Sequence, residues 1–483
     1  MPELEERLGL AGLAATELLD GYGRGSFTPS DVIEDVIGQL TALQERLNVM
    51  TIDMFDEARE AAAAATAAWR RGEPSGPMCG VPVTVKDLIY VRNVRGAAGS
   101  PALRDFVPAA DSAPVERLRR AGAILTCKTT TCESGYKLTA DSPLTGVTRN
   151  PWRSDRTSGG SSGGAAAAVA AGAGPLALGT DGVGSIRVPA SFCGVVGLKP
   201  TYGLVPRSPG FSPPSWASLA HTGPIGRTVA DVALMLGVIA GYDTRDAASL
   251  PVPRAYYGMG FPPRRLKVAV SLDLGYAAVA ADVRAAVTAA AGALANAGID
   301  VEFCDLAVEA DCLDAILKPI ALTEQAAAAS VRSSDDLAKS DEEYRDVIKQ
   351  GRGYRGTDYI EASFRRAALR ENFRRLFEHY DLLLTPTVAT TAFAAGQLGV
   401  DEIDGRAVDR HLGWSPFSWP MNLTGLPAAT VPCGFDRDDL PIGLQIVGPW
   451  LAEERILHLA SLFEAIRPWR HHVPAVAKVS AGA

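Results

Sequence analysis

The sequence predicts an α/β protein with one large mixed β-sheet covered by helices on both faces. Three observations lead to this prediction. Short β-branched strands alternate with alanine-rich helices from about residue 73 onward. Strand segments such as "VPVTVK" at 81–86 are apolar almost throughout, as expected for strands buried under two layers of helices. The chain has 483 residues and no internal repeat, so it is long enough to bury one large core.

The segment 1–72 is predicted to be helical and to pack on this core. Thr28 and Pro29 start a helix, because threonine caps helices and proline fits their first turn. The apolar positions of that helix recur at helical spacing and are Val32, Val36, Ile37 and Leu40. A single main domain is expected over 73–470, and a short tail over 471–483.

Within the main domain the order of elements follows from composition and turn residues. Short β-branched runs predict strands at 81–86, 123–128, 176–180, 266–271, 299–304, 381–387, 428–433 and 442–448. Helical periodicity and alanine content predict helices at 112–122, 163–172, 279–298 and 453–466, and a long helical region from about 308 to 380. The alternation places helices between most of the strands, which is the pattern of a doubly covered sheet.

Composition excludes several classes of protein. Hydrophobic residues make up 47% and charged residues 21%, which is ordinary for a globular protein. The net charge of -8 gives no electrostatic reason to expect nucleic acid or an anionic membrane as a partner. The N-terminus is acidic where a signal peptide would be basic, and the most apolar stretches are short and interrupted by glycine. We therefore expect a cytoplasmic protein.

Cysteine and histidine patterns give no sign of a disulfide framework or a metal site. The seven cysteines are odd in number, scattered and without a CxxC pair, so free thiols are expected. The six histidines form no HExxH motif. We expect neither a metal nor a cofactor.

Two segments combine serine with many glycines. The first, "TSGGSSGGAAAAVAAG" at 157–172, is compatible with a simple helix cap by Ser161 or Ser162, but four glycines around two serines also suggest a closely packed or strained backbone. The second, "GTDGVGSIRVPA" at 179–190, is compatible with a tight turn between strand and helix. Its successive N–H groups could equally converge on the negative charge of a tetrahedral intermediate while Ser185 attacks.

A nucleophilic serine needs a base, and Lys86 is the candidate. It ends the apolar strand at 81–86, where it is either a solvent-facing strand end or a buried amine. Burial would lower its pKa from about 10.4 and leave a neutral amine that can accept a proton. Histidine is the usual alternative, and His221 is the nearest to these segments in the sequence.

Several motifs in order resemble the amidase signature family. They are "GVPVTVKDL", "TRNPW", "GGSSGG", "GTDGVGSIRVPASFCGVVGLKPTYG" and "GLPAATVPCGF" followed by "LPIGLQIVGP". The resemblance covers about residues 10–465 and implies the amidase signature fold, with 73–470 as the catalytic domain. It also implies a Ser–cis-Ser–Lys triad, in which Lys86 is the base, Ser161 the relay and Ser185 the nucleophile. The bond between Gly160 and Ser161 is then expected to be cis.

The same resemblance implies an oxyanion hole built from the backbone N–H groups of Gly182, Val183, Gly184 and Ser185. Many family members have glycine where this chain has Val183. Valine disfavours positive φ, so we expect negative φ there, with a side chain that could narrow the acyl pocket. The segment 127–134, "CKTTTCES", also departs from the family's GKTN-like run, and we expect it to border the substrate.

Two neighbouring features have a structural and a functional interpretation. Asp181 and Arg187 are predicted to form an ion pair behind the glycine turn, and the alternative is that Arg187 receives a substrate carboxylate. The aromatic run with Trp414, Phe417 and Trp419 is predicted to be core. As a substrate-facing wall, it would instead favour apolar or aromatic acyl groups.

The expected function is amide hydrolysis. The resemblance implies an amidase that cleaves a carboxamide or arylamide C–N bond to an acid plus ammonia or an amine, through a seryl acyl-enzyme and without a cofactor. We expect a small-molecule amide as partner, no nucleic acid and no membrane, and leave a homodimer open. The alternatives are the glutaminase-type A subunit of a tRNA-dependent amidotransferase, and an esterase with a Ser161–His221 pair.

Overall fold

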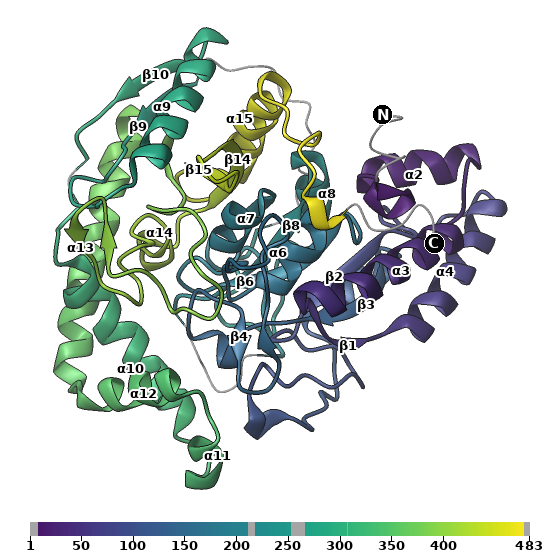
Figure 1. The fold of residues 1–483 in the computed structure, drawn as a ribbon, viewed down its shortest axis with the longest axis horizontal. Coiled ribbons are helices and arrows are strands. Elements are labelled where there is room, and N and C mark those ends of the chain that lie inside the picture. The colour runs from purple at the N-terminus through teal and green to yellow at the C-terminus, as the bar shows by residue number, and fades with distance from the viewer. Residues whose placement is uncertain (1–7, 211–217, 253–265, 307, 478–483) are drawn as a thin grey trace.

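The computed structural model describes residues 8–210, 218–252, 266–306 and 308–477. Its centre is an 11-stranded sheet (Figure 1). In spatial order the strands are β1 (Met50–Asp53), β3 (Ile124–Thr129), β2 (Pro82–Lys86), β6 (Leu176–Asp181), β8 (His221–Gly226), β7 (Val196–Lys199), β14 (Ala428–Phe435), β15 (Pro441–Val447), β11 (Leu382–Pro386), β9 (Lys267–Val270) and β10 (Asp300–Phe303).

The sheet is mixed, as the sequence predicts. Strand β2 runs parallel to both β3 and β6, and β9 runs parallel to β10 and β11. The strands between these two groups pair antiparallel, from β6 through β8, β7, β14 and β15 to β11. Two small ribbons lie outside the sheet: β4 (Asp141–Ser142) with β5 (Gly146–Val147), and β12 (Glu402–Ile403) with β13 (Arg406–Ala407).

Alternate side chains of β6 enter two different hydrophobic clusters, so both faces of the sheet are covered. Ala177 packs with the alanines of α6 (Gly163–Ala170), whereas Leu176 and Leu178 share a cluster with α8 (Val229–Ile239). The other helices are α2 (Ala15–Arg24), α3 (Pro29–Leu47), α4 (Phe55–Arg70), α5 (Ala113–Arg120), α7 (Arg187–Cys193), α9 (Ala281–Asn296), α10 (Lys318–Ala329), α11 (Ser334–Ala338), α12 (Glu342–Gly353), α13 (Gly356–His379), α14 (Trp419–Thr424) and α15 (Glu453–Ile466).

The N-terminal helices lie at the β1–β3 end of the sheet, and helices α10–α13 form a separate green group away from them (Figure 1). The predicted helix start is confirmed, since the Thr28 hydroxyl accepts the Asp31 N–H at 3.3 Å and Pro29 opens α3. The N-terminal segment is not wholly helical, because β1 pairs with β3. Residues 1–7 and 478–483 lie outside the described residues, and the domain boundaries stay a prediction.

The predicted strands and helices of the main domain are present, and β7 and β8 are additional strands. Their sequences, "VGLK" and "HTGPIG", are short and rich in glycine or proline, so strand periodicity does not reveal them. The predicted long helical region at about 308–380 is present and consists of several helices, from a π-helical turn at Leu313–Leu317 to α13.

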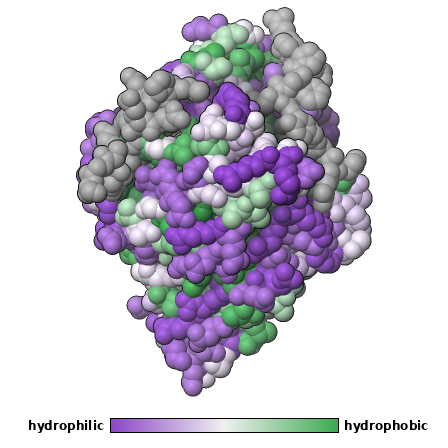
Figure 2. Space-filling model, turned by 90° about the vertical axis from the view of Figure 1, so that its right-hand side faces the viewer, coloured by the Kyte–Doolittle hydropathy of each residue, from purple (hydrophilic) through white to green (hydrophobic). Residues whose placement is uncertain are grey.

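The hydrophilic surface and the unpaired cysteines are consistent with the composition of the chain. The face beside the N-terminal helices is largely hydrophilic with small scattered hydrophobic patches (Figure 2). No helix within the described ranges is long and apolar enough to cross a membrane. All seven cysteines are unpaired, as predicted.

The close approach of α6 to β3 gives a stability prediction. A Cβ on Gly164 would lie 2.4 Å from the Val49 carbonyl oxygen and 2.7 Å from the Thr130 backbone nitrogen. We expect Gly164→Ala to lower the free energy of unfolding by about 1 to 3 kcal/mol, measured by urea denaturation. The matched control is Gly292→Ala in α9, where a Cβ would meet nothing within 4 Å. It should be neutral or stabilising by up to about 1 kcal/mol, and equal effects of the two substitutions would mean that the contact at Gly164 does not require glycine.

Candidate active site

The candidate catalytic residues come from neighbouring elements at one edge of the sheet. Lys86 is the last residue of β2, and Thr180 is the penultimate residue of β6. Because β2 and β6 are parallel neighbours, their carboxyl ends lie side by side. Ser161 lies just before α6, and Ser185 lies in the turn between β6 and α7. The Ser162 N–H donates to the Ser185 carbonyl at 3.1 Å and joins the two serine segments.

The Lys86 amine is fully buried and surrounded by hydroxyls. Its Nζ donates to Ser161 Oγ at 2.7 Å and to Thr180 Oγ1 at 2.9 Å. Burial lowers the pKa of Lys86 to about 7, although Cys132 and Asp181 act in the opposite direction. A large fraction of this amine is therefore uncharged near neutral pH and can accept a proton. Thr180 is a partner that sequence reasoning missed.

The two serines of the GGSSGG segment have different partners. The Gly160–Ser161 peptide is cis, as expected from the resemblance. A Cβ on Gly160 would lie 2.2 Å from the Thr139 carbonyl carbon, which explains why glycine is needed there. Ser162 does not cap α6 with its side chain, and its hydroxyl donates to the Thr180 carbonyl at 3.1 Å instead. Of these two serines, Ser161 is therefore the one that contacts the Lys86 amine.

The glycine turn after β6 presents free backbone donors. Among the described residues, the N–H groups of Gly182, Val183 and Ser185 have no acceptor. The Gly184 N–H differs, since it donates to Asp181 Oδ1 at 2.8 Å. The prediction that Gly184 contributes a free donor to the oxyanion hole is therefore corrected. The other three groups could receive negative charge on a substrate oxygen.

Local packing fixes the shape of this turn. Val183 keeps negative φ, as predicted, and its buried side chain belongs to the main hydrophobic core. Gly184 has a φ of 134°, and a Cβ there would lie 2.6 Å from Ser418 Oγ. The Ser418 hydroxyl in turn donates to the Val183 carbonyl at 2.6 Å.

No hydrogen bond joins Ser185 Oγ to Ser161 in the described structure. Catalytic hydrogen bonds often tighten only when substrate binds.

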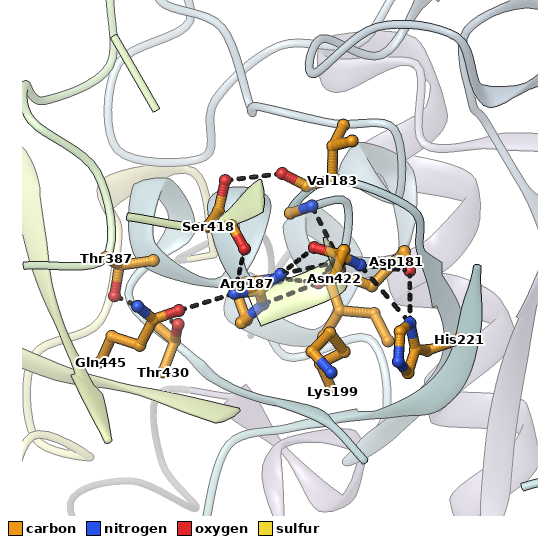
Figure 3. Close-up of polar contacts among 12 residues, drawn as sticks. Asp181, Val183, Arg187, Lys199, His221, Thr387, Ser418, Asn422, Thr430 and Gln445 are labelled. Atoms are coloured by element: carbon orange, nitrogen blue, oxygen red, sulfur yellow. Dashed lines mark hydrogen bonds and ion pairs between the residues drawn. The ribbon is translucent and has the colours of Figure 1, made fainter. Parts of the chain in front are cut away.

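A buried ion pair lies under the turn (Figure 3). Arg187 Nε and Nη2 each donate to the Asp181 carboxylate at 2.9 Å. The remaining guanidinium hydrogens go to the Ser418 carbonyl and to the side-chain oxygens of Gln445 and Asn422, at 2.6 to 2.8 Å. The predicted structural ion pair is confirmed. Because every Arg187 donor is used, the alternative role of Arg187 as a receptor for a substrate carboxylate is excluded.

Asp181 is the centre of this arrangement. Burial alone would raise the pKa of its carboxyl, but Arg187 holds that pKa well below its usual range. The carboxylate accepts N–H groups from Gly184 at 2.8 Å and Ile186 at 3.2 Å, and the Asn422 amide at 2.9 Å. These bonds tie both sides of Ser185 to one rigid anion.

His221 belongs to the same buried region, beside Lys199 (Figure 3). Its Nδ1 lies 2.7 Å from the Leu219 carbonyl oxygen, and burial lowers its pKa well below the ordinary value. Ser161 bonds to Lys86 and not to His221. The alternative Ser161–His221 pair therefore lacks its defining hydrogen bond. Lys199 Nζ donates to the Pro200 carbonyl at 3.1 Å.

The aromatic run is core, as predicted. Trp414, Phe417 and Trp419 are all at most 1% exposed, and Trp414 packs against Phe192 and Phe393. These rings support the segment that carries Ser418, so they contribute to the shape of the glycine turn and not to an open substrate wall.

Comparison with known proteins agrees with this geometry. The family model described as Amidase matches residues 31–457. The chain is 37% identical to the A subunit of the glutamyl-tRNA(Gln) amidotransferase of Synechococcus sp. (strain RCC307), covering 92% of this chain and 95% of that one. It is 33% identical to an acylamidase of Rhodococcus erythropolis, covering 96% and 97%.

A solved structure described as a bacterial aryl acylamidase of the amidase signature family superimposes with a TM-score of 0.90. It is 29% identical, and the match covers 97% of this chain and 99% of that one. The fold, the match over nearly the whole chain and these relatives lead to one conclusion. The chain belongs to the amidase signature family, a family of hydrolases that act on amide C–N bonds.

Proposed function

We propose that this protein is a stand-alone amidase that hydrolyses a carboxamide or arylamide to an acid and ammonia or an amine through a seryl acyl-enzyme. The observation that carries the proposal is the buried Lys86 amine, 2.7 Å from Ser161 Oγ and without a hydrogen-bonded carboxylate partner. Such an amine is a proton acceptor at neutral pH. It adjoins a turn with free N–H donors, and the two together suit acyl transfer.

The proposed steps use only groups of this chain. Lys86 takes the proton of Ser161, Ser161 takes the proton of Ser185, and Ser185 Oγ bonds to the amide carbonyl carbon. The N–H groups of Gly182 and Val183 stabilise the resulting oxyanion. Ser161 then returns a proton to the amide nitrogen as the C–N bond breaks. Water enters through the same relay, attacks the acyl-enzyme and releases the acid.

A second candidate is a glutaminase-type A subunit of a tRNA-dependent amidotransferase, favoured by the 37% identical relative. The test is the purified chain alone with glutamine and with an arylamide. We expect arylamide turnover without any partner protein. Glutamine turnover that appears only with a partner would instead favour the second candidate.

The nucleophile assignment gives the first activity prediction. Ser185→Ala should lower kcat by about 10⁴-fold or more, because the acyl-enzyme cannot form. Release of the aromatic amine from an arylamide measures this. Ser191→Ala on α7 is a suitable control, because that serine lies on the same turn–helix unit without being assigned a role in the relay. Burst formation of acyl-enzyme in Ser185→Ala would refute the assignment.

The pH dependence follows from Lys86. Its uncharged form is the active base, so kcat/KM should fall about tenfold per pH unit below neutrality and level off above pH 7 to 8. Lys86→Ala should cost several orders of magnitude at every pH. A kcat/KM that keeps rising to pH 10 would mean that the amine has the ordinary pKa of a solvent-exposed lysine. A maximum at acid pH would exclude a lysine base.

Thr180 should orient the Lys86 amine. Thr180→Val removes the hydroxyl that accepts one Nζ hydrogen at 2.9 Å but preserves the volume of the side chain. We expect kcat to fall by about 10- to 100-fold, because a misplaced base loses part of the general-base contribution, while KM changes little. Thr180→Ser should retain most of the activity. Equal loss in both variants would indicate a packing role only.

A further inference from the structure

Arg227 is a buried arginine whose terminal nitrogens take part in no hydrogen bond with the described residues. It lies between β8 and α8 and is 8% exposed. Neither its Nη1 nor its Nη2 has an acceptor there. The buried Arg187, in contrast, uses all of its donors. Burying a guanidinium without an acceptor is costly, because the group loses its hydration and gains no partner.

The Arg227 guanidinium lines a small cavity beside the C-terminal segment, residues 467–477. The volume of this cavity is about 20 Å³. Leu8 lines it too, and a Cβ on Gly172 would lie 3.2 Å from Leu8 Cδ2 and 3.6 Å from Arg227 Nη1. The donors without an acceptor therefore lie at the wall of the cavity.

The basic side chains that line this cavity are Arg227, Arg470 and His472, and no described carboxylate lines it. Arg470 Nε, like the two Arg227 nitrogens, is buried and has no described acceptor. Trp152 and Trp469 also line the cavity, but their indole N–H groups donate to backbone carbonyls at 2.8 and 3.0 Å. The unused donors on the wall are thus all guanidinium N–H groups.

The nearby carboxylates have other partners. Glu17 accepts both Nη groups of Arg470, at 2.7 and 3.0 Å, and Asp231 accepts the Thr16 N–H at 3.3 Å. Burial and the neighbouring Arg470 lower the pKa of Arg227 to about 10, while Asp231 and Glu17 act in the opposite direction. The described side chains therefore compensate the positive charge of Arg227 only in part.

We propose that this cavity is a binding site for a monatomic anion of the size of chloride, held by the Nη groups of Arg227 and the Nε of Arg470. Hydrogen bonds from a guanidinium to an anion are charge-assisted and stronger than those to a neutral acceptor. A cavity needs roughly 10 to 15 Å³ to hold one water molecule. At about 20 Å³, this one has room for a single small ion and not for a tetrahedral phosphate or sulfate.

An anion at this position links three parts of the chain that are far apart in sequence. Trp469 Nε1 donates to the Arg227 carbonyl, which places the C-terminal segment beside the start of α8 (Figure 1). Arg470 reaches Glu17 on α2. A ligand that binds only the folded protein stabilises it. The site therefore implies a saturable dependence of stability on chloride, independent of the catalytic steps.

The first experiment is thermal denaturation of the purified chain while sodium gluconate is exchanged for sodium chloride at constant ionic strength. The wild-type Tm should rise by about 2 to 3 °C when chloride is roughly a hundredfold above its dissociation constant. Arg227→Met should lose this rise, whatever its own Tm. The matched control is Arg467→Met, which removes an exposed positive charge from the same segment and should keep the full rise.

The second experiment needs no substitution. Wild-type crystals soaked in sodium bromide should show an anomalous peak within hydrogen-bond distance of Arg227 Nη and Arg470 Nε. A water at this position that bridges Arg227 to Asp231 Oδ2, which also has no partner among the described residues, would overturn the inference. Bromide on exposed side chains alone, an adventitious ion only, would overturn it too. So would equal chloride dependence of Tm in Arg227→Met and the wild type.

Discussion

The rest of the site depends on one constraint, the burial of the Lys86 amine away from water. Keeping Lys86 uncharged near pH 7 costs about 4 kcal/mol relative to water, which a core of this size can offset. No hydrogen-bonded carboxylate increases this cost by stabilising the charged form, because the amine is hydrogen-bonded to two hydroxyls. The nearby anion, Asp181, is neutralised by Arg187 at 2.9 Å. Without that arginine, the carboxylate would favour the charged amine and remove the base.

The same ion pair links the base to the oxyanion turn. Asp181 holds the N–H groups of Gly184 and Ile186 on either side of Ser185, and Arg187 reaches across to the segment of Ser418, which holds the Val183 carbonyl. A turn fixed by buried, fully satisfied groups needs little reorganisation when charge develops on a substrate. The N–H groups of Gly182, Val183 and Ser185 take no part in this network and stay available to a substrate oxygen.

The motifs of the candidate site and the strands of the sheet are read from different signals in the sequence. Lys86, Ser161 and Ser185 lie in motifs whose glycines require close backbone contacts, as at Gly160 and Gly184. Strands β7 and β8 were missed because glycine and proline hide their periodicity. Thr180 was missed because a threonine at the end of a strand is common and carries no motif. The sequence did not reveal that the Gly184 N–H is unavailable to a substrate. Its acceptor is the carboxylate of Asp181, three residues earlier, which turns back toward it.

A cavity of about 280 Å³ between the loop after β2 and helices α10–α12 could not be predicted at all, since these segments lie more than 200 residues apart in the sequence and neither carries a motif. This separation has a chemical consequence. The base, the relay and the turn belong to β2, β6 and α6, where packing allows almost no change. The wall residues lie on a surface loop and on α10–α12, where a substitution alters shape without disturbing the buried ion pair. The shape of this cavity can therefore change while the base, the relay and the turn stay fixed.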